Sequence, residues 1–203
     1  MDYLPNVLIF GHSFIKRIER KTRTNPDTFK SDFGLKQCNV TLIGHGGLNF
    51  GLRDPRKERQ FYNIVDNIFR CNAFDIVVCQ LGGNDISYGT SPDALKDAVI
   101  SLAKYVRTNY NVKVFYVCSI FTRPNPRTIP AEYYEAFRAQ ANALIKEHSE
   151  TSDTIVFWPH KRLFHSPQYI FGEDGTHLND YGNKKFYKSL RQAIIFSVER
   201  YRA

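Results

Sequence analysis

Five short apolar runs alternate along the chain with longer segments in which apolar residues recur at helical spacing. The runs are rich in β-branched and aromatic residues, and they are continuously apolar rather than alternating. That pattern is typical of strands buried on both faces of a parallel sheet. The predicted strands lie at 6–11, 38–44, 75–82, 112–119 and 154–159.

The segments between these runs have the length and periodicity of amphipathic helices. One helix start is marked by Ser91 and Pro92, because serine is a favoured cap and proline a favoured first helical residue. Strands that alternate with such helices form βαβ units, so we predict a three-layer α/β/α sandwich around a mainly parallel, five-stranded sheet. The predicted helices cover 13–20, 57–70, 91–109, 131–149 and 180–201.

The chain has 203 residues, of which 42% are hydrophobic, and no Pro/Gly/Ser-rich linker divides it. We therefore predict a single domain over residues 1–203. The longest apolar runs are too short to span a membrane, and the first of them is predicted to be a strand rather than a secretory signal. The cysteines lie far apart without zinc-like spacing, which favours reduced thiols and a cytoplasmic location. They are Cys38, Cys71, Cys79 and Cys118.

The net charge of +8 leaves two interpretations open. Basic residues cluster at 16–23, at 53–59 and in the last helix. Such clusters attract polyanions, including nucleic acid. They are also compatible with solvated helix faces, the interpretation we favour, because Glu19, Asp54 and Glu58 interrupt the first two clusters.

Polar, glycine-rich turns follow the first three predicted strands, at 11–13, 44–47 and 82–85. A fourth such turn, at 173–182, precedes the last helix. Ligands of open α/β sheets bind beyond the carboxyl ends of the strands. We therefore expect these turns to meet at one edge of the sheet and to form a binding site.

Ser13, in the first of these turns, has two interpretations. It could cap the following helix, or it could present a nucleophilic hydroxyl at the strand end. Acyl transfer through serine also needs a base, a group that orients the base, and donors for the oxyanion. His177 is the candidate base, and Asp174 can reach its far nitrogen if the turn between them is tight. Candidate oxyanion donors are the Asn84 amide, a glycine N–H after the second strand and the N–H of Ser13.

Taken together and in this order, these turns resemble the motifs of the SGNH (GDSL-type) hydrolase superfamily. The resemblance rests on Gly-x-Ser, a glycine after the second strand, Gly-x-Asn-Asp and Asp-x-x-His, and it runs from Gly11 to His177. It implies an SGNH or flavodoxin-like fold and a Ser13–His177–Asp174 triad. It also implies an oxyanion hole of Ser13, Gly47 and Asn84, with Gly46 as the close alternative to Gly47. No metal or organic cofactor is implied.

The family includes esterases, lipases, thioesterases and carbohydrate deacetylases. We therefore expect a serine ester hydrolase that forms a covalent acyl-enzyme on small-molecule or glycan esters with short acyl or O-acetyl groups. One alternative is an acyltransferase that uses the same triad. The other is a catalytically inactive SGNH-like module that binds nucleic acid or another polyanion.

One residue departs from the family pattern. His12 stands where the family usually has Asp, so that Gly-Asp-Ser becomes Gly-His-Ser. His12 could add positive charge near the oxyanion, compete for the Ser13 proton or contact the substrate. His45 and Gly46 are further candidate substrate contacts.

Two other features lie near the predicted strand ends. His160 and His165 are five residues apart, a spacing that suits no common pair of metal ligands, so no metal site is predicted. The Pro-rich segment 121–130 follows the fourth strand and is a candidate cover for the site.

Overall fold

The structure is a computed structural model that describes residues 3–161, 163 and 169–203. Within these residues it contains one sheet of five parallel strands in the order β2-β1-β3-β4-β5. The predicted strands are confirmed, although most are one to three residues shorter than the apolar runs. They are β1 Asn6–Gly11, β2 Asn39–Gly44, β3 Ile76–Gln80, β4 Val114–Cys118 and β5 Ile155–Trp158.

The predicted helices are also confirmed, and one short helix is added. α4 begins as expected, with the Ser91 hydroxyl accepting from the Ala94 N–H at 3.3 Å and Pro92 in the first turn. The added helix is α3, a single turn that the sequence pattern presents only as a glycine-rich turn. The helices are α1 Ser13–Thr24, α2 Pro55–Cys71, α3 Gly83–Ser87, α4 Pro92–Tyr110, α5 Ala131–Glu150 and α6 Asp180–Arg202.

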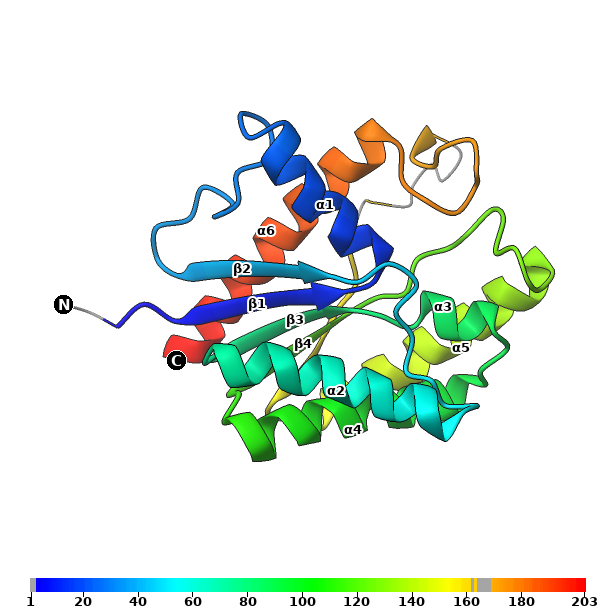
Figure 1. The fold of residues 1–203 in the computed structure, drawn as a ribbon, viewed down its shortest axis with the longest axis horizontal. Helices are drawn as coiled ribbons and strands as arrows, with labels where there is room; N and C mark the ends of the chain where they lie inside the picture. The colour runs from blue at the N-terminus through cyan, green and yellow to red at the C-terminus, as the bar shows by residue number, and fades with distance from the viewer. Residues whose placement is uncertain (1–2, 162, 164–168) are drawn as a thin grey trace.

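Side chains that alternate along each strand bury two separate faces of the sheet. Leu8 and Phe10 of β1 pack with α2, α4 and α5. Val7 and Ile9 pack with α1 and α6 on the opposite face. Figure 1 shows these two helical layers on either side of the sheet. The three-layer α/β/α sandwich is therefore confirmed.

The strand order places a topological switch point between β1 and β3. From β1 the chain passes to β2 on one side, and β3, β4 and β5 then follow on the other. The connections diverge at such a point and leave a crevice beyond the carboxyl ends of the two central strands. Ser13 comes just after the end of β1 and Asn84 lies on α3, which follows the end of β3, so both lie at this crevice.

No helix in the described part of the chain is long and apolar enough to cross a membrane. All four cysteines are unpaired, and Cys71 is the exposed one. The single-domain organisation and the cytoplasmic location stay predictions.

Candidate active site

Ser13 is the first residue of α1, and the helix does not use its hydroxyl as a cap. The N-cap position is His12, whose side chain makes no capping hydrogen bond. By contrast, the Asp54 carboxylate caps α2 and the Asn179 amide caps α6. The capping interpretation of Ser13 is therefore wrong. As a first-turn residue, Ser13 also has a backbone N–H with no acceptor inside the helix.

Asp174 and His177 lie on a tight turn that leads into α6. The Gly172 N–H donates to the His177 carbonyl at 2.8 Å, and Phe171 and Leu178 form an antiparallel bridge across the base of the turn. Asp174 Oδ1 accepts from the N–H groups of Thr176 and His177 at 3.0 and 2.8 Å. These bonds leave Oδ2 free to face the imidazole.

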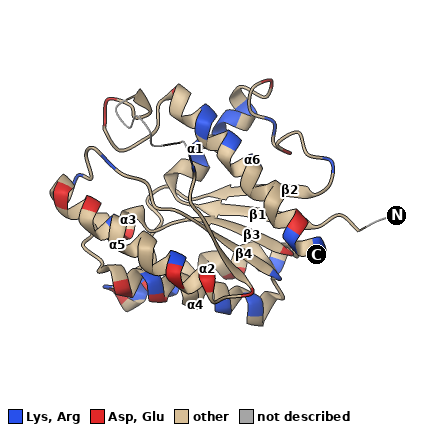
Figure 2. Ribbon diagram, turned by 180° about the vertical axis from the view of Figure 1, so that it is seen from behind, with Lys and Arg blue, Asp and Glu red and all other residues tan. Residues whose placement is uncertain are grey.

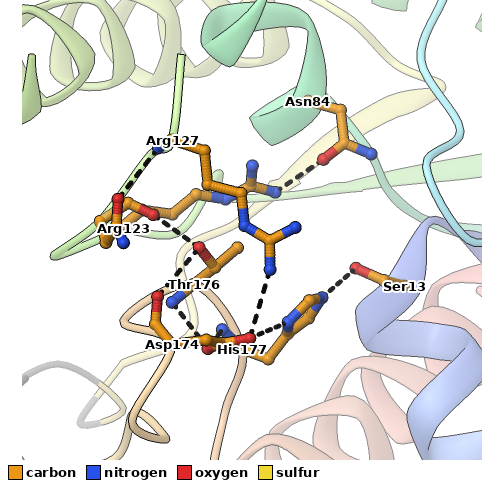
Figure 3. Close-up of polar contacts among 8 residues, drawn as sticks. Ser13, Asn84, Arg123, Arg127, Asp174, Thr176 and His177 are labelled. Carbon is orange, nitrogen blue, oxygen red and sulfur yellow. Dashed lines mark hydrogen bonds and ion pairs between the residues drawn. The ribbon is translucent and has the colours of Figure 1, made fainter. Parts of the chain in front are cut away.

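The turn brings Asp174, His177 and Ser13 into one hydrogen-bonded line. His177 Nδ1 lies 2.6 Å from Asp174 Oδ2, and His177 Nε2 lies 3.2 Å from Ser13 Oγ. Figure 3 shows the three side chains pointing toward one another, with Ser13 on α1 and the other two on the turn. Residues 164 positions apart in the chain thus meet in the crevice.

The electrostatics of this line suit a neutral imidazole beside an ionised carboxylate. Burial lowers the pKa of His177, the hydrogen bond that the ring donates to Asp174 raises it, and Arg17 and Arg127 lower it, so the net pKa is below its ordinary value. For Asp174, burial raises the pKa, but hydrogen bonds from the His177 backbone and ring outweigh burial and lower it overall. At neutral pH His177 can therefore accept a proton.

Asn84, on α3, is held by a partner at each end of its amide. Its Nδ2 donates to the Leu48 carbonyl at 2.8 Å, and its Oδ1 accepts from Arg123 Nη2 at 3.0 Å. Because arginine only donates and a carbonyl only accepts, the two partners fix which end of the amide is NH₂. One N–H of Asn84 is used by Leu48, and the other is available to a ligand.

The neighbouring Asp85 ties α3 to the β2–α2 loop. It is buried, its Oδ1 accepts from the Phe50 N–H at 2.7 Å, and burial raises its pKa to about 7. Asn84 and Asp85 therefore clamp the segment 48–50, which follows directly on the glycine turn. The clamp fixes the position of that turn relative to Asn84.

Gly46 and Gly47 form the exposed tip of this turn, which is closed by a 3.3 Å bond from the Leu48 N–H to the His45 carbonyl. With His45 they border a cavity of about 450 Å³ whose lining also includes Leu52 and Tyr88. Ser13, Asn84 and His177 do not line this cavity, so it is separate from the Ser13–His177 pair. His45 and Gly46 thus border a space that a ligand can enter.

His12, unlike His45, is buried. Only 1% of its side chain is exposed, and its ring packs 5.0 Å from the Phe14 ring. Burial lowers the pKa of His12 well below its usual value, so at neutral pH it adds no positive charge beside Ser13. It offers a bound substrate almost no surface, which argues against a direct substrate contact.

His160 serves a structural role in the described part of the chain. It is buried, with Nδ1 2.7 Å from Ser189 Oγ and Nε2 2.9 Å from Gln80 Oε1. Burial lowers the pKa of His160 to about 3. His165 lies outside the described residues. Among the residues that are described, no three His, Cys, Asp or Glu side chains are grouped as a metal site would require.

Sequence analysis missed two arginines that the structure brings to the site, Arg123 and Arg127. Both belong to the Pro-rich segment 121–130, whose composition predicts a cover but gives no role to either side chain. Arg123 is 5% exposed and lies between Asn84, the Ser87 hydroxyl and the Tyr134 ring. It passes so close to Gly83 that a Cβ there would lie 2.8 Å from its Nη2. The second glycine of Gly-Gly-Asn-Asp therefore makes room for Arg123.

Comparison with known proteins identifies the family of the chain. Residues 10–185 match the model of the GDSL-like lipase/acylhydrolase family. No curated protein sequence matches the chain.

Solved structures share the fold at low sequence identity. A protein from Slackia heliotrinireducens, described as an SGNH hydrolase, is 16% identical with a TM-score of 0.66, and the match covers 95% of this chain and 100% of that one. A G-D-S-L family lipolytic protein from Veillonella parvula is 16% identical with a TM-score of 0.64, covering 94% and 98%. A family 3 carbohydrate esterase from Talaromyces cellulolyticus is 15% identical with a TM-score of 0.61, covering 97% and 99%.

The family match spans both ends of the crevice, from the strand that precedes Ser13 to the start of the helix that follows His177. With this match, the chain belongs to the GDSL-like lipase/acylhydrolase family.

Proposed function

We propose that the protein is a serine ester hydrolase that works through a covalent acyl-enzyme on short-acyl or O-acetyl esters. The observation that carries the proposal is the unbroken line from Asp174 Oδ2 through the His177 ring to Ser13 Oγ, with contacts of 2.6 and 3.2 Å. Membership of a lipase/acylhydrolase family supports the same class of reaction.

In the first half of the reaction, His177 takes the proton of Ser13, and Oγ attacks the ester carbonyl carbon. The oxyanion that forms would be held by the N–H groups of Ser13 and Gly47 and by the free N–H of Asn84. When this intermediate collapses, the bond to the alcohol oxygen breaks and His177 returns its proton to the leaving alcohol.

In the second half, His177 removes a proton from water, and the hydroxyl oxygen attacks the acyl-enzyme carbonyl. The bond to Ser13 Oγ breaks, the acid leaves, and Ser13 regains its proton. Asp174 keeps the imidazole oriented with its Nε2 toward Ser13 and stabilises the imidazolium that forms in both halves. No step requires a metal or an organic cofactor.

A fluorophosphonate probe and p-nitrophenyl acetate test this proposal directly. We expect nitrophenolate release and the attachment of one probe per chain, found by mass spectrometry on the peptide that carries Ser13. The exposed Ser101 of α4 is the internal control and should stay unlabelled. Absence of both hydrolysis and labelling would favour the alternative, a polyanion-binding module that uses the basic surface; salt-dependent retention on heparin would then be expected.

Arg123 is a positioning residue in this mechanism, because it acts on the oxyanion through Asn84. Loss of an oxyanion donor typically lowers kcat by about 10²–10³-fold, so we expect that effect for Asn84→Ala. Arg123→Met frees the Asn84 amide without removing it, and we expect a smaller loss of about 10–100-fold. Both expected losses are to be tested by measuring kcat with p-nitrophenyl acetate as the substrate.

The double variant separates positioning from general damage to the fold. If Arg123 acts through Asn84, Arg123→Met should lower kcat little further in the Asn84→Ala background. Losses that simply multiply would contradict the assignment. Thermal unfolding of each variant shows whether the fold itself is affected.

A further inference from the structure

Two guanidinium groups approach the Ser13–His177 pair from different elements. Arg17 lies on α1 four residues after Ser13, and therefore on the same face of the helix. Arg127 lies on the segment after β4, and its Nη2 is 3.4 Å from Asp174 Oδ2. Figure 3 shows the Arg127 side chain reaching across the site toward Asp174 and His177. The positive charges of both arginines act on the His177 ring.

The positive charges of Arg17 and Arg127 are only partly balanced by acidic side chains. Asp174 is the one acid among the charged groups that act on His177 in the described structure, and it is already engaged by the Thr176 and His177 N–H groups and the imidazole. Arg17 is half-buried and makes no hydrogen bond or ion pair with any described residue. The site thus carries an excess of positive charge before a substrate binds.

This excess opposes the proposed reaction unless the substrate compensates for it. His177 becomes an imidazolium in the transition state, and like charges nearby disfavour that form. An anionic group beside the arginines would offset this repulsion and would itself be attracted to the site. The net charge of +8, with basic residues gathered on α1 (Figure 2), also draws anions toward this end of the molecule.

Arg127 is held in place by the segment that carries it. The Asn125 N–H donates to the Gly175 carbonyl at 2.9 Å, and the Thr176 hydroxyl donates to the Asn125 carbonyl at 2.5 Å. Gly175 permits this contact, since a Cβ there would lie 2.9 Å from that of Asn125. Arg127 itself has a φ of 73°, a left-handed conformation that is unusual for a residue with a side chain.

The position of the arginines selects one half of the ester. The carbonyl oxygen must face Asn84 and the glycine turn, whereas the leaving oxygen must lie near His177 Nε2 to receive its proton. Arg127 pairs with Asp174, and the charges of Arg17 and Arg127 both act on the His177 ring, the group that delivers the proton to the leaving oxygen. We propose that the alcohol half of the substrate carries an oxyanion group, such as a carboxylate or a sulfonate, that Arg17 and Arg127 bind.

This inference rests on the proposed ester hydrolysis and is tested with two acetyl esters of matched shape. They are 4-acetoxybenzenesulfonate, which is anionic, and 4-acetoxybenzenesulfonamide, which is neutral; each kcat/KM is divided by the rate constant of that ester with hydroxide. An exposed ion pair contributes a factor of about 2–5, so two arginines predict a preference of about tenfold for the sulfonate at low salt. The preference should shrink as salt is added.

Variants assign the preference to the two side chains. Arg17→Gln and Arg127→Gln should each reduce it severalfold, the double variant should abolish it, and Arg127→Lys should retain part of it. Arg59→Gln removes the same charge from an exposed position on α2, across the sheet, and should leave the preference unchanged. Equal use of the two esters by the wild type, or a preference that survives in the double variant, would overturn the inference.

A binding measurement keeps this test separate from that of the proposed function. If neither ester is hydrolysed, the hydrolase proposal fails, and the anion site is then judged by calorimetry with 4-hydroxybenzenesulfonate and 4-hydroxybenzenesulfonamide. Tighter binding of the sulfonate that is lost in the double variant supports the site. Equal binding of the two phenols overturns it.

Discussion

Ser13→Ala is expected to lower kcat/KM for p-nitrophenyl acetate by about 10⁴-fold or more and to abolish fluorophosphonate labelling. The hydroxyl is the atom that attacks the carbonyl in the proposed mechanism, and no neighbouring hydroxyl occupies an equivalent place beside His177 in the described structure. The α1 helix should be unaffected, because the cap position is His12 and not Ser13. Initial rates and an unfolding curve for the same preparation measure both effects.

His177→Ala in the same assay shows whether the two residues act as a unit. Members of a catalytic triad are strongly non-additive, so the double variant should be hardly less active than either single variant. Ser101→Ala, on the exposed face of α4, is the matched control and should keep the wild-type rate. A Ser13→Ala protein that retains a tenth of the activity would place the nucleophile elsewhere.

The strands and the order of the sheet-edge turns were accessible to sequence analysis because they depend on local patterns. A strand buried on both faces is a continuous apolar run, and a parallel sheet brings every carboxyl end to one edge. The helix α3 could not be predicted, again because the prediction depends on a local pattern. Its five residues begin with glycine and contain a single apolar side chain, so no helical period can be detected.

For the candidate site, sequence analysis could identify only the residues that belong to recognisable motifs. Ser13, Asn84, Asp174 and His177 stand at element ends in a recognisable order, and the structure brings Ser13, Asp174 and His177 into contact. Arg123 and Arg127 carry no such signal, because their roles arise from where the segment after β4 packs. Burial of His12 is likewise a tertiary property: its ring packs against that of Phe14, and the residue type alone does not reveal this.

Asp174→Asn is expected to lower kcat by about 10³–10⁴-fold, although it replaces one oxygen with nitrogen. The two backbone N–H groups at 3.0 and 2.8 Å require the amide oxygen at the Oδ1 position. The NH₂ group then faces His177 Nδ1, which must become an acceptor, and the ring proton moves to Nε2. An Nε2–H donates to Ser13 Oγ and cannot remove its proton.

The same variant should lower the pKa of His177, as measured by NMR titration of its ring. In the wild type, Asp174 raises that pKa while burial, Arg17 and Arg127 lower it. Without the carboxylate only the lowering effects remain, so the ring should protonate at a lower pH than in the wild type. The acidic limb of any residual activity should move in the same direction.

Arg127→Gln removes one charge that lowers the pKa of His177 and should shift the midpoint of the ring titration upward. Glu173→Gln, at the neighbouring exposed carboxylate, is the control. An Asp174→Asn midpoint that rises, or activity within tenfold of the wild type, would show that Asp174 does not orient this imidazole.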